Sequence, residues 1–238
     1  MVVCKLLILC EVKLILITNM NARSIRDQVY DSLKEQIITL KILPGTALSE
    51  NEMAVQYNVS RTPIRESFVR LAQEGLVQVL PQRGTLVSLI DNSLVEEARF
   101  MRSQLECAII DLACQSFPEA SIHQLEQNLA QQKDCLARED VDHIFTLDQQ
   151  YHALLFTGTN KMHTWNTMSL LTAHLDRSRK LRLLDNHDWK LIVQQHEQII
   201  ETIKARDSKQ AIAVMKQHLN RGIDDLAILS EKYPHYFA

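Results

Sequence analysis

Apolar residues recur every three or four positions early in the chain, which is the spacing of one face of an α-helix. This pattern predicts helices over residues 24–40, 50–57 and 61–73. Pro63 suits the first turn of the third helix, where its missing N–H costs little. Asn58 tolerates the left-handed conformation that closes the second. The chain is therefore expected to begin its fold with three short helices.

The pattern then changes to two short β-type runs. Residues 76–80 and 85–88 are rich in Val and Leu, and Pro81-Gln82-Arg83-Gly84 separates them, which predicts a β-hairpin. Three helices followed by a hairpin are typical of a winged helix-turn-helix. We assign this domain to residues 23–90.

Helical periodicity returns beyond residue 94 and continues to about residue 233. No strand pattern interrupts it, so we predict an antiparallel all-α bundle of six or seven helices over residues 94–232. Such a bundle is expected to pack against a second copy of itself as a homodimer. Breaks are predicted near residues 117–118, 138–142, 158–161 and 185–189.

The composition supports a mainly α chain with two domains. Its 238 residues exceed what one compact core usually organises, and 5 Gly and 5 Pro are too few for a turn-rich β-protein. The 5 Cys include no Cys-x-x-Cys pair, which excludes a zinc ribbon or a dithiol motif. Reduced thiols favour a cytoplasmic location.

The first 22 residues are an extension whose status the pattern leaves open. Lys5, Glu11 and Lys13 interrupt its apolar stretch, which argues against a membrane span and a membrane partner. Two interpretations compete. Translation starts at Met20, or the extension is an apolar arm that packs on a partner.

The third helix has the features of a DNA-recognition helix. Arg61 and Arg65 are four residues apart and so share a face, from which Arg can bind guanine O6 and N7. Thr62 can contact a phosphate or a thymine methyl group, and Arg83 and Gly84 suit the tip of a wing. Residues 21–90 hold eight basic against seven acidic residues, so the pattern rather than net charge supports DNA binding.

Four blocks of the winged domain occur in a characteristic order: Leu43-Pro44-Gly45-Thr46-x-Leu48-Ser49-Glu50, Val59-Ser60-Arg61-Thr62-Pro63-Ile64-Arg65-Glu66-Ser67, Glu74-Gly75-Leu76 and Arg83-Gly84. Together they resemble the GntR family of bacterial transcription regulators. The resemblance implies a dimeric repressor on a short pseudo-palindromic operator in double-stranded DNA. It assigns base reading to Arg61 and Arg65, and supporting contacts to Asn51, Thr62, Arg83 and Gly84.

A second group of residues could bind a metal. Asp148 and His152 are four residues apart, so both can face one ion. His196 and His218 are each flanked by apolar residues that would turn them toward a core. A buried histidine is more often a core residue than a ligand, so these residues alone leave both interpretations open.

These residues belong to a longer series of motifs: Arg102-x2-Leu105-Glu106, Asp148-x3-His152, Gly158-x-Asn160, His196-x2-Ile199, Asp207-x3-Ala211 and His218. The order of the motifs resembles the FCD effector domain of the FadR branch of that family. The resemblance implies a divalent metal held by Asp148, His152, His196 and His218, with an organic acid bound beside it. One carboxylate and three imidazoles suit Zn or Ni.

An acidic effector also requires a fixed cationic donor. Arg102 can supply a bidentate guanidinium, although it can instead pair with Glu106 four residues on. Arg221 shares the face of His218 and is a second candidate. The cluster Arg177, Arg179, Lys180 and Arg182 is expected to be a solvated or interface surface.

The predicted function is a DNA-binding transcriptional regulator, and not an enzyme, whose operator binding responds to a small carboxylic acid. A metal-dependent hydrolase fused to a DNA-binding domain is the alternative, since a metal with open positions can be catalytic. Against it, Ile200 stands where a His-Glu-x-x-His motif beginning at His196 needs its second histidine. A third hypothesis is an architectural DNA protein without an effector.

Overall fold

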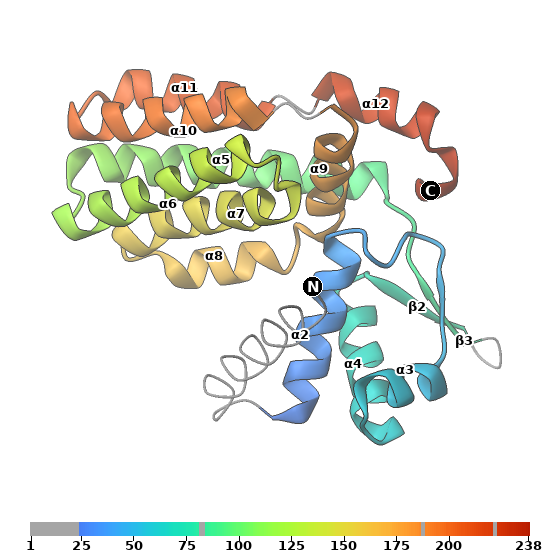
Figure 1. Cartoon of the computed structure of the whole chain (residues 1–238). Coiled ribbons are helices and arrows are strands. Elements are labelled where there is room, and N and C mark those ends of the chain that lie inside the picture. Colours follow the sequence, from blue (N-terminus) through green and yellow to red (C-terminus); the bar gives the residue numbers. More distant parts are fainter. Residues whose placement is uncertain (1–23, 81–83, 187–188, 221–222) are drawn as a thin grey trace, which may run out of the picture.

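The computed structural model describes residues 24–80, 84–186, 189–220 and 223–238. They form a small winged domain below a larger helical domain in the view of Figure 1. The fold is mainly α with one small antiparallel sheet, which confirms the predicted fold class.

The winged domain contains the three predicted helices and the predicted hairpin. A further short strand, β1, which the sequence pattern did not reveal, pairs with β3, so the sheet has the order β1-β3-β2. The elements are α2 (Ile25–Ile38), β1 (Ala47–Leu48), α3 (Glu50–Tyr57), α4 (Arg61–Gln73), β2 (Val77–Leu80) and β3 (Gly84–Val87).

Local side chains fix the ends of these helices. The Ser24 hydroxyl accepts from the backbone N–H of Asp27 at the start of α2, and Ser49 accepts from that of Glu52 at the start of α3. Asn58 has φ 53°, the left-handed conformation predicted for it, so the chain turns directly from α3 into α4. This turn sets the two helices of the helix-turn-helix against each other.

The helical domain contains eight α-helices among the described residues, rather than six or seven. Short breaks at residues 170–172 and 205–207 divide segments whose apolar periodicity continues across them. Arg206 adopts φ 56° at one break without a glycine to signal it. The helices are α5 (Asn92–Gln115), α6 (Glu119–Ala137), α7 (Val141–Gly158), α8 (Met162–Ser169), α9 (Ala173–Asn186), α10 (Trp189–Lys204), α11 (Ser208–Asn220) and α12 (Ile223–Lys232).

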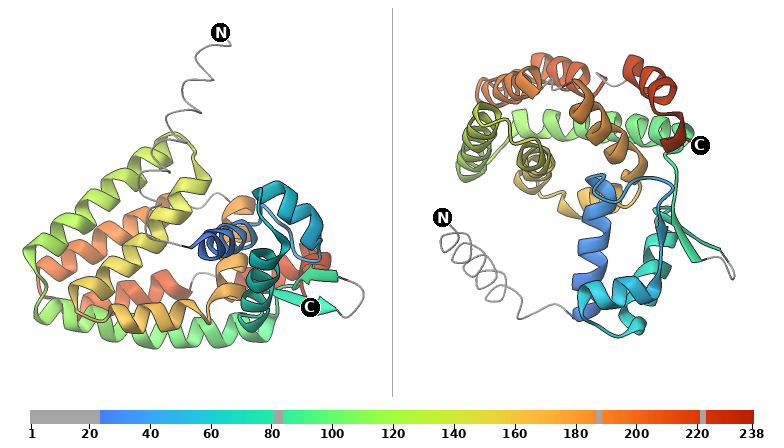
Figure 2. Two further views of the ribbon diagram at one scale, coloured as in Figure 1. Left: turned by 90° about the horizontal axis from the view of Figure 1, so that it is seen from below. Right: turned by 45° about the vertical axis from the view of Figure 1, so that its right-hand side comes forward.

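Helix α9 lies where the two domains meet (Figure 1). Its first residue, Ala173, is buried in the apolar core of the winged domain. Leu175 and Leu181 instead belong to a separate junction core with the linker residue Ile90. The views in Figure 2 show the winged domain beside one end of the bundle, with the end of the chain close to the start of α5.

The last residues of the chain are attached to the interdomain linker. Ile90 donates its backbone N–H to the carbonyl of Tyr236 at 2.8 Å and accepts from the N–H of Ala238 at 2.9 Å. The chain between the domains is thus held from two sides, by α9 and by the C-terminal segment.

Two expectations concern the amino-terminal segment. The extension 1–22 and the start at Met20 lie outside the described residues. None of the described helices is long and apolar enough to cross a membrane.

Candidate DNA-reading surface and metal centre

Helix α4 separates its apolar residues from the predicted reading residues. Ile64, Phe68 and Leu71 are buried in the core of the winged domain. Arg61 and Arg65 lie on the exposed side, with side chains 57% and 62% exposed, and Thr62 is exposed beside them. The helix therefore offers two guanidinium groups to solvent, as insertion into a major groove requires.

Both guanidinium groups bind one carboxylate from the preceding helix. Glu50, the first residue of α3, accepts from Arg61 Nη2 at 2.9 Å and from Arg65 Nε and Nη2 at 3.0 and 2.8 Å. Hydrogen bonds from Arg65 and then Arg61 lower the pKa of Glu50 to about 2, so the carboxylate is charged at neutral pH. No role was predicted for Glu50 from the sequence.

The structure describes two of the three other residues that are predicted to contact DNA. Asn51 is exposed in the first turn of α3. Gly84 is exposed at the start of β3 with φ 93°, a conformation that L side chains rarely adopt. Arg83 lies outside the described residues.

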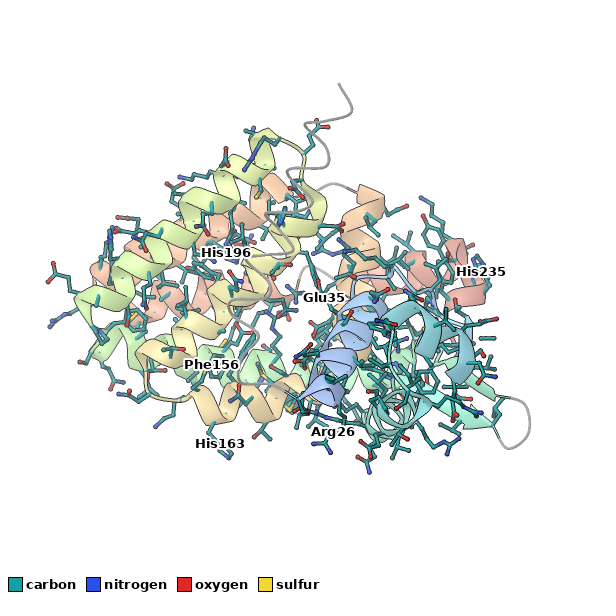
Figure 3. All side chains as sticks on the ribbon, turned by 60° about the horizontal axis from the view of Figure 1, so that its bottom comes forward. Arg26, Glu35, Phe156, His163, His196 and His235 are labelled. Atoms are coloured by element: carbon teal, nitrogen blue, oxygen red, sulfur yellow. The ribbon has the colours of Figure 1, made fainter. Side chains whose placement is uncertain are left out.

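The four predicted metal ligands come together in the bundle. Asp148 and His152 project from α7, His196 from α10 and His218 from α11, and one ligand atom from each lies within 4.8 Å of the others. All four side chains are buried. Figure 3 shows His196 inside the helical domain, whereas His163 on α8 points outward. The fold thus gathers residues that are up to 70 positions apart into one potential metal site.

Each histidine is oriented by a hydrogen bond at its Nδ1 atom. His152 Nδ1 bonds Glu106 Oε2 at 2.5 Å, and His196 Nδ1 bonds Gln132 Oε1 at 2.8 Å. His218 Nδ1 bonds Gln195 Oε1 at 3.2 Å.

Because these partners occupy the Nδ1 atoms, the Nε2 atoms are left for the centre. His152 and His218 Nε2 are 3.1 Å apart, and Asp148 Oδ1 lies 3.7 Å from His196 Nε2. Partners of this kind typically fix the tautomer of metal-binding histidines.

Two buried atoms at the centre of the cluster are available to bind a ligand. Within the part of the chain that the structure describes, Asp148 Oδ1 and His196 Nε2 are buried without a hydrogen-bond partner. Leaving such atoms unsatisfied costs about 1–3 kcal/mol each. A divalent cation bound between them would satisfy both, so the residues present fit a metal.

The protonation states also fit. Burial lowers the pKa of His196 to about 3 and that of His218 well below its usual value, so both are neutral at pH 7. Burial is the largest influence on the pKa of Asp148 and raises it, but the surrounding positive charges, that of Arg179 first, together outweigh burial, and the net shift is strongly downward. Neutral imidazoles and an ionised carboxylate are the forms that bind metals.

The prediction that the cluster Arg177, Arg179, Lys180 and Arg182 is a solvated or interface surface is wrong. Arg177 and Lys180 are fully buried, and Arg182 is 8% exposed. Arg179 Nη2 donates to Asp148 Oδ2 at 2.5 Å. Charge along α9 resembled a solvent-facing helix, but carboxylates and carbonyl groups of neighbouring elements accept hydrogen bonds from Arg177, Arg179 and Lys180.

A small cavity of about 40 Å³ opens beside Asp148 and His218. Arginine side chains dominate its polar lining, and apolar residues complete it. Arg102 is buried there. Its Nε donates to Glu106, and its Nη2 has no hydrogen-bond partner among the described residues. Arg102 thus pairs with Glu106, and its Nη2 group can still donate to a ligand. The arginines lining the cavity are Arg99, Arg102, Arg179 and Arg182.

The second predicted effector residue, Arg221, lies outside the described residues. The cavity instead includes Arg179 and Arg182, which were not predicted to bind the effector. The Asp176-x2-Arg179 spacing is a sequence signal that Arg179 has an acidic partner. In the structure, Arg179 Nη1 donates to Asp176 at 3.2 Å, and Arg179 also binds Asp148.

Helix α9 also carries contacts to the interdomain linker. Arg177 donates to the backbone carbonyls of Ser88 and Leu89 at 2.6 and 3.4 Å. The His174 Nδ1 atom accepts the backbone N–H of Asp91 at 2.9 Å. Burial, and then the charge of Arg177, lower the pKa of His174 to about 4, which keeps it neutral as this acceptor role requires. One helix therefore touches the linker through Arg177 and the metal centre through Arg179.

Two family models match the chain. Residues 25–87 match the model described as bacterial regulatory proteins of the gntR family. Residues 97–221 match the FCD domain. Together these matches cover the winged domain and most of the helical domain.

Similar proteins cover nearly the full length. An HTH-type transcriptional regulator from an unstable DNA locus of Streptomyces ambofaciens is 37% identical over 220 residues, 92% of each chain. The HTH-type transcriptional repressor RspR of Escherichia coli is 34% identical over 214 residues, 90% of this chain and 94% of RspR.

Solved structures agree on the fold. Escherichia coli McbR/YncC superposes with a TM-score of 0.76 at 19% identity, over 89% of this chain and 99% of that one. The relatives are regulators rather than enzymes, which confirms the expectation that the chain is not an enzyme and disfavours the metallohydrolase alternative.

Proposed function

Because the chain belongs to the GntR family of bacterial transcription regulators and carries an FCD domain, we propose that it is a cytoplasmic repressor controlled by a small carboxylic acid. The acid binds next to a divalent metal in the helical domain, residues 94–232, and alters operator binding by the winged domain, residues 23–90. The observation that carries the proposal is the buried four-residue centre, which opens into an arginine-lined cavity.

Asp148, His152, His196 and His218 would hold the metal, and Zn or Ni suits this donor set. When bound, the metal supplies a positive charge that attracts a carboxylate. The chain's own residues provide the rest of the site. Arg102 lines the cavity and has an Nη2 group without a hydrogen-bond partner among the described residues, and Arg179 binds the second oxygen of Asp148.

The cavity favours a short acid over a long-chain one. About 40 Å³ accommodates a few water-sized groups, and Arg99, Arg102, Arg179 and Arg182 make its wall cationic. Bidentate guanidinium contacts bind carboxylates strongly and with a fixed geometry. We therefore assign the effector to small hydroxy acids rather than fatty-acid derivatives.

DNA binding is assigned to a homodimer on a short pseudo-palindrome, because a two-fold symmetric protein reads two half-sites. Arg61 and Arg65 read bases, and Thr62, Asn51, Arg83 and Gly84 make supporting contacts. The exposed apolar side chains of Leu94, Phe100 and Leu171 support self-association, since a patch of this kind seldom stays solvated.

Helix α9 provides the connection between the two sites. Arg179 binds Asp148, and two residues earlier Arg177 donates to the carbonyl of Ser88, so a change at Asp148 would be passed to the linker through this helix. A displacement of this helix by the bound acid would change the linker and hence the spacing of the two reading heads. Such coupling requires the acid to bind the DNA-competent and DNA-incompetent states with different affinity.

Fluorescence anisotropy tests the proposal with a labelled duplex from the gene's own upstream region, a scrambled duplex and a panel of small carboxylic acids. We expect specific binding that one acid shifts, and chromatography should recover that acid unchanged. Specific binding that no acid shifts would remove the effector role. Consumption of the acid would instead restore the hydrolase hypothesis.

The connection through α9 has its own test. Arg177→Met removes the donors to the linker while leaving every proposed metal ligand in place. We expect metal content and acid affinity to match those of the unmodified protein, and the acid-induced shift in operator affinity to be lost. Arg177→Lys, which retains one donor, should show an intermediate shift. An undiminished shift in both variants would exclude Arg177 from the coupling.

A further inference from the structure

The contacts of Glu50 with both candidate base-reading arginines suggest a role that differs from DNA contact itself. Glu50 begins α3, whereas Arg61 and Arg65 lie in the first two turns of α4, so the turn at Asn58 brings them together. A carboxylate among groups that must bind polyanionic DNA lowers the attraction for phosphate. A carboxylate at this position is therefore expected to improve DNA recognition in another way.

The hydrogen bonds that Arg65 donates to Glu50 indicate how recognition is improved. A guanidinium group has two usable edges, one formed by Nε and Nη2 and one by Nη1 and Nη2. Glu50 binds the Nε and Nη2 edge, at 3.0 and 2.8 Å. The Nη1 and Nη2 edge is left pointing away from the carboxylate, and an edge of this type pairs with guanine O6 and N7.

Glu50 also restrains Arg61 through Nη2 at 2.9 Å. Both arginine side chains are more than half exposed, and free long side chains lose rotamer freedom on binding. A shared carboxylate orients both before DNA arrives, which reduces that loss. The same carboxylate cancels one of their two positive charges, which weakens contacts with phosphates of any sequence.

We propose that Glu50 is a positioning residue that sets sequence specificity: it fixes the orientation of Arg61 and Arg65 for base reading and suppresses their binding to arbitrary DNA. This inference rests on the proposed assignment of the two arginines as base readers. Glu50 raises the ratio of specific to random affinity rather than the affinity itself.

The test measures the Kd of the full-length protein for two duplexes. One is the duplex that the unmodified protein selects from a random-sequence library, and the other is a scrambled duplex of the same composition. The variants are Glu50→Gln, Glu50→Asp and the matched control Glu52→Gln. Glu52 is an exposed acid in the same helical turn, so the control removes the same charge close by.

For Glu50→Gln we expect tighter binding to scrambled DNA, a specificity ratio about 10-fold lower, and a salt dependence steeper by about one phosphate contact. Glu50→Asp keeps the charge but withdraws the carboxylate by one methylene group. It should lower the ratio while leaving the salt dependence unchanged, an outcome that loss of charge alone would not produce. Glu52→Gln should leave the ratio as it is.

A specificity ratio that is the same in Glu50→Gln, Glu52→Gln and the unmodified protein would overturn the inference. Arg65→Ala separates this failure from that of the underlying assignment. If Arg65→Ala lowers the ratio and Glu50→Gln does not, only the role of Glu50 is excluded. If Arg65→Ala leaves the ratio unchanged, the base-reading assignment itself fails.

Discussion

The winged domain and the helical domain handle charge in opposite ways. In the winged domain, the candidate functional cations Arg61 and Arg65 are exposed above an apolar core. In the helical domain, Asp148, His152 and His196 are fully buried. The first arrangement suits recognition of a large polyanion from outside. The second suits a small ligand that must be enclosed to be distinguished from water.

The difference also determines which contacts are tolerated. An exposed arginine remains solvated when its partner is absent, so the DNA-reading surface is stable without DNA. A buried carboxylate oxygen without a partner is costly, and Asp148 Oδ1 is such an atom among the described residues. The helical domain should therefore depend on its ligand for stability, whereas the winged domain should not.

The largest expected effect follows from removing a ligand at the buried centre. His196→Ala should reduce metal affinity by more than about 100-fold, since loss of an outer partner alone costs about 10–100-fold. Metal content by elemental analysis after dialysis checks this. His163→Ala, at an exposed histidine on α8, is the matched control. Equal metal content in both variants would remove His196 from the site.

A smaller loss is expected at the exposed surface. Arg65→Ala should weaken specific DNA binding by about 1–3 kcal/mol, because it removes a bidentate base contact. Anisotropy titrations on specific and scrambled duplexes measure the effect. Equal weakening on the two duplexes would show that Arg65 contacts phosphate rather than bases.

A further variant tests whether the hydrogen-bond partners of the ligand histidines affect metal affinity. Gln132→Met preserves the bulk of the side chain but removes the oxygen that bonds His196 Nδ1. The imidazole could then carry its proton at Nε2, and metal affinity should fall by about 10-fold. A competition titration with a chromophoric chelator measures it. Unchanged affinity would mean that Gln132 does not select the tautomer.

A pH-dependent effect is expected at the domain junction. The pKa of His174 is about 4 in the folded chain, against about 6.5 when unfolded. As pH falls below 6.5, the unfolded state takes up the proton first, so the folded state loses stability down to pH 4. This residue should contribute about 3 kcal/mol to that loss by pH 4.

Urea unfolding at pH 7, 5.5 and 4 checks the effect of His174. His174→Asn can still accept the Asp91 N–H but does not titrate in this range, so it should unfold with a weaker pH dependence. His163→Ala, at an exposed histidine on α8, should keep the full dependence. If His174→Asn and the unmodified chain lose equal stability on acidification, the prediction is wrong.

The sequence predicted the winged domain more fully than the buried site. Helices α3 and α4 begin and end where the apolar spacing and Asn58 indicate, because local signals determine them. Strand β1 was missed because two residues carry no periodicity, and its pairing with β3 comes from distant chain.

At the buried site, the pattern alone could not separate a metal centre from core histidines. His196 and His218 have the same apolar neighbours in either case, so only the resemblance pointed to ligands. Arg179 was misplaced for a related reason. Charged residues along α9 predict a solvated helix, and the carboxylate that receives Arg179 lies 31 positions away on α7. Tertiary pairing of this kind leaves little trace in local periodicity.

The most direct test of the account measures whether the buried centre and the DNA-reading surface form one thermodynamic system. Calorimetry would determine the affinity of the metal-loaded protein for the effective acid, first alone and then saturated with the specific duplex. The account predicts that DNA changes the acid affinity by the same factor by which the acid changes DNA affinity, about 5–150-fold. An acid affinity unaffected by the duplex would contradict it.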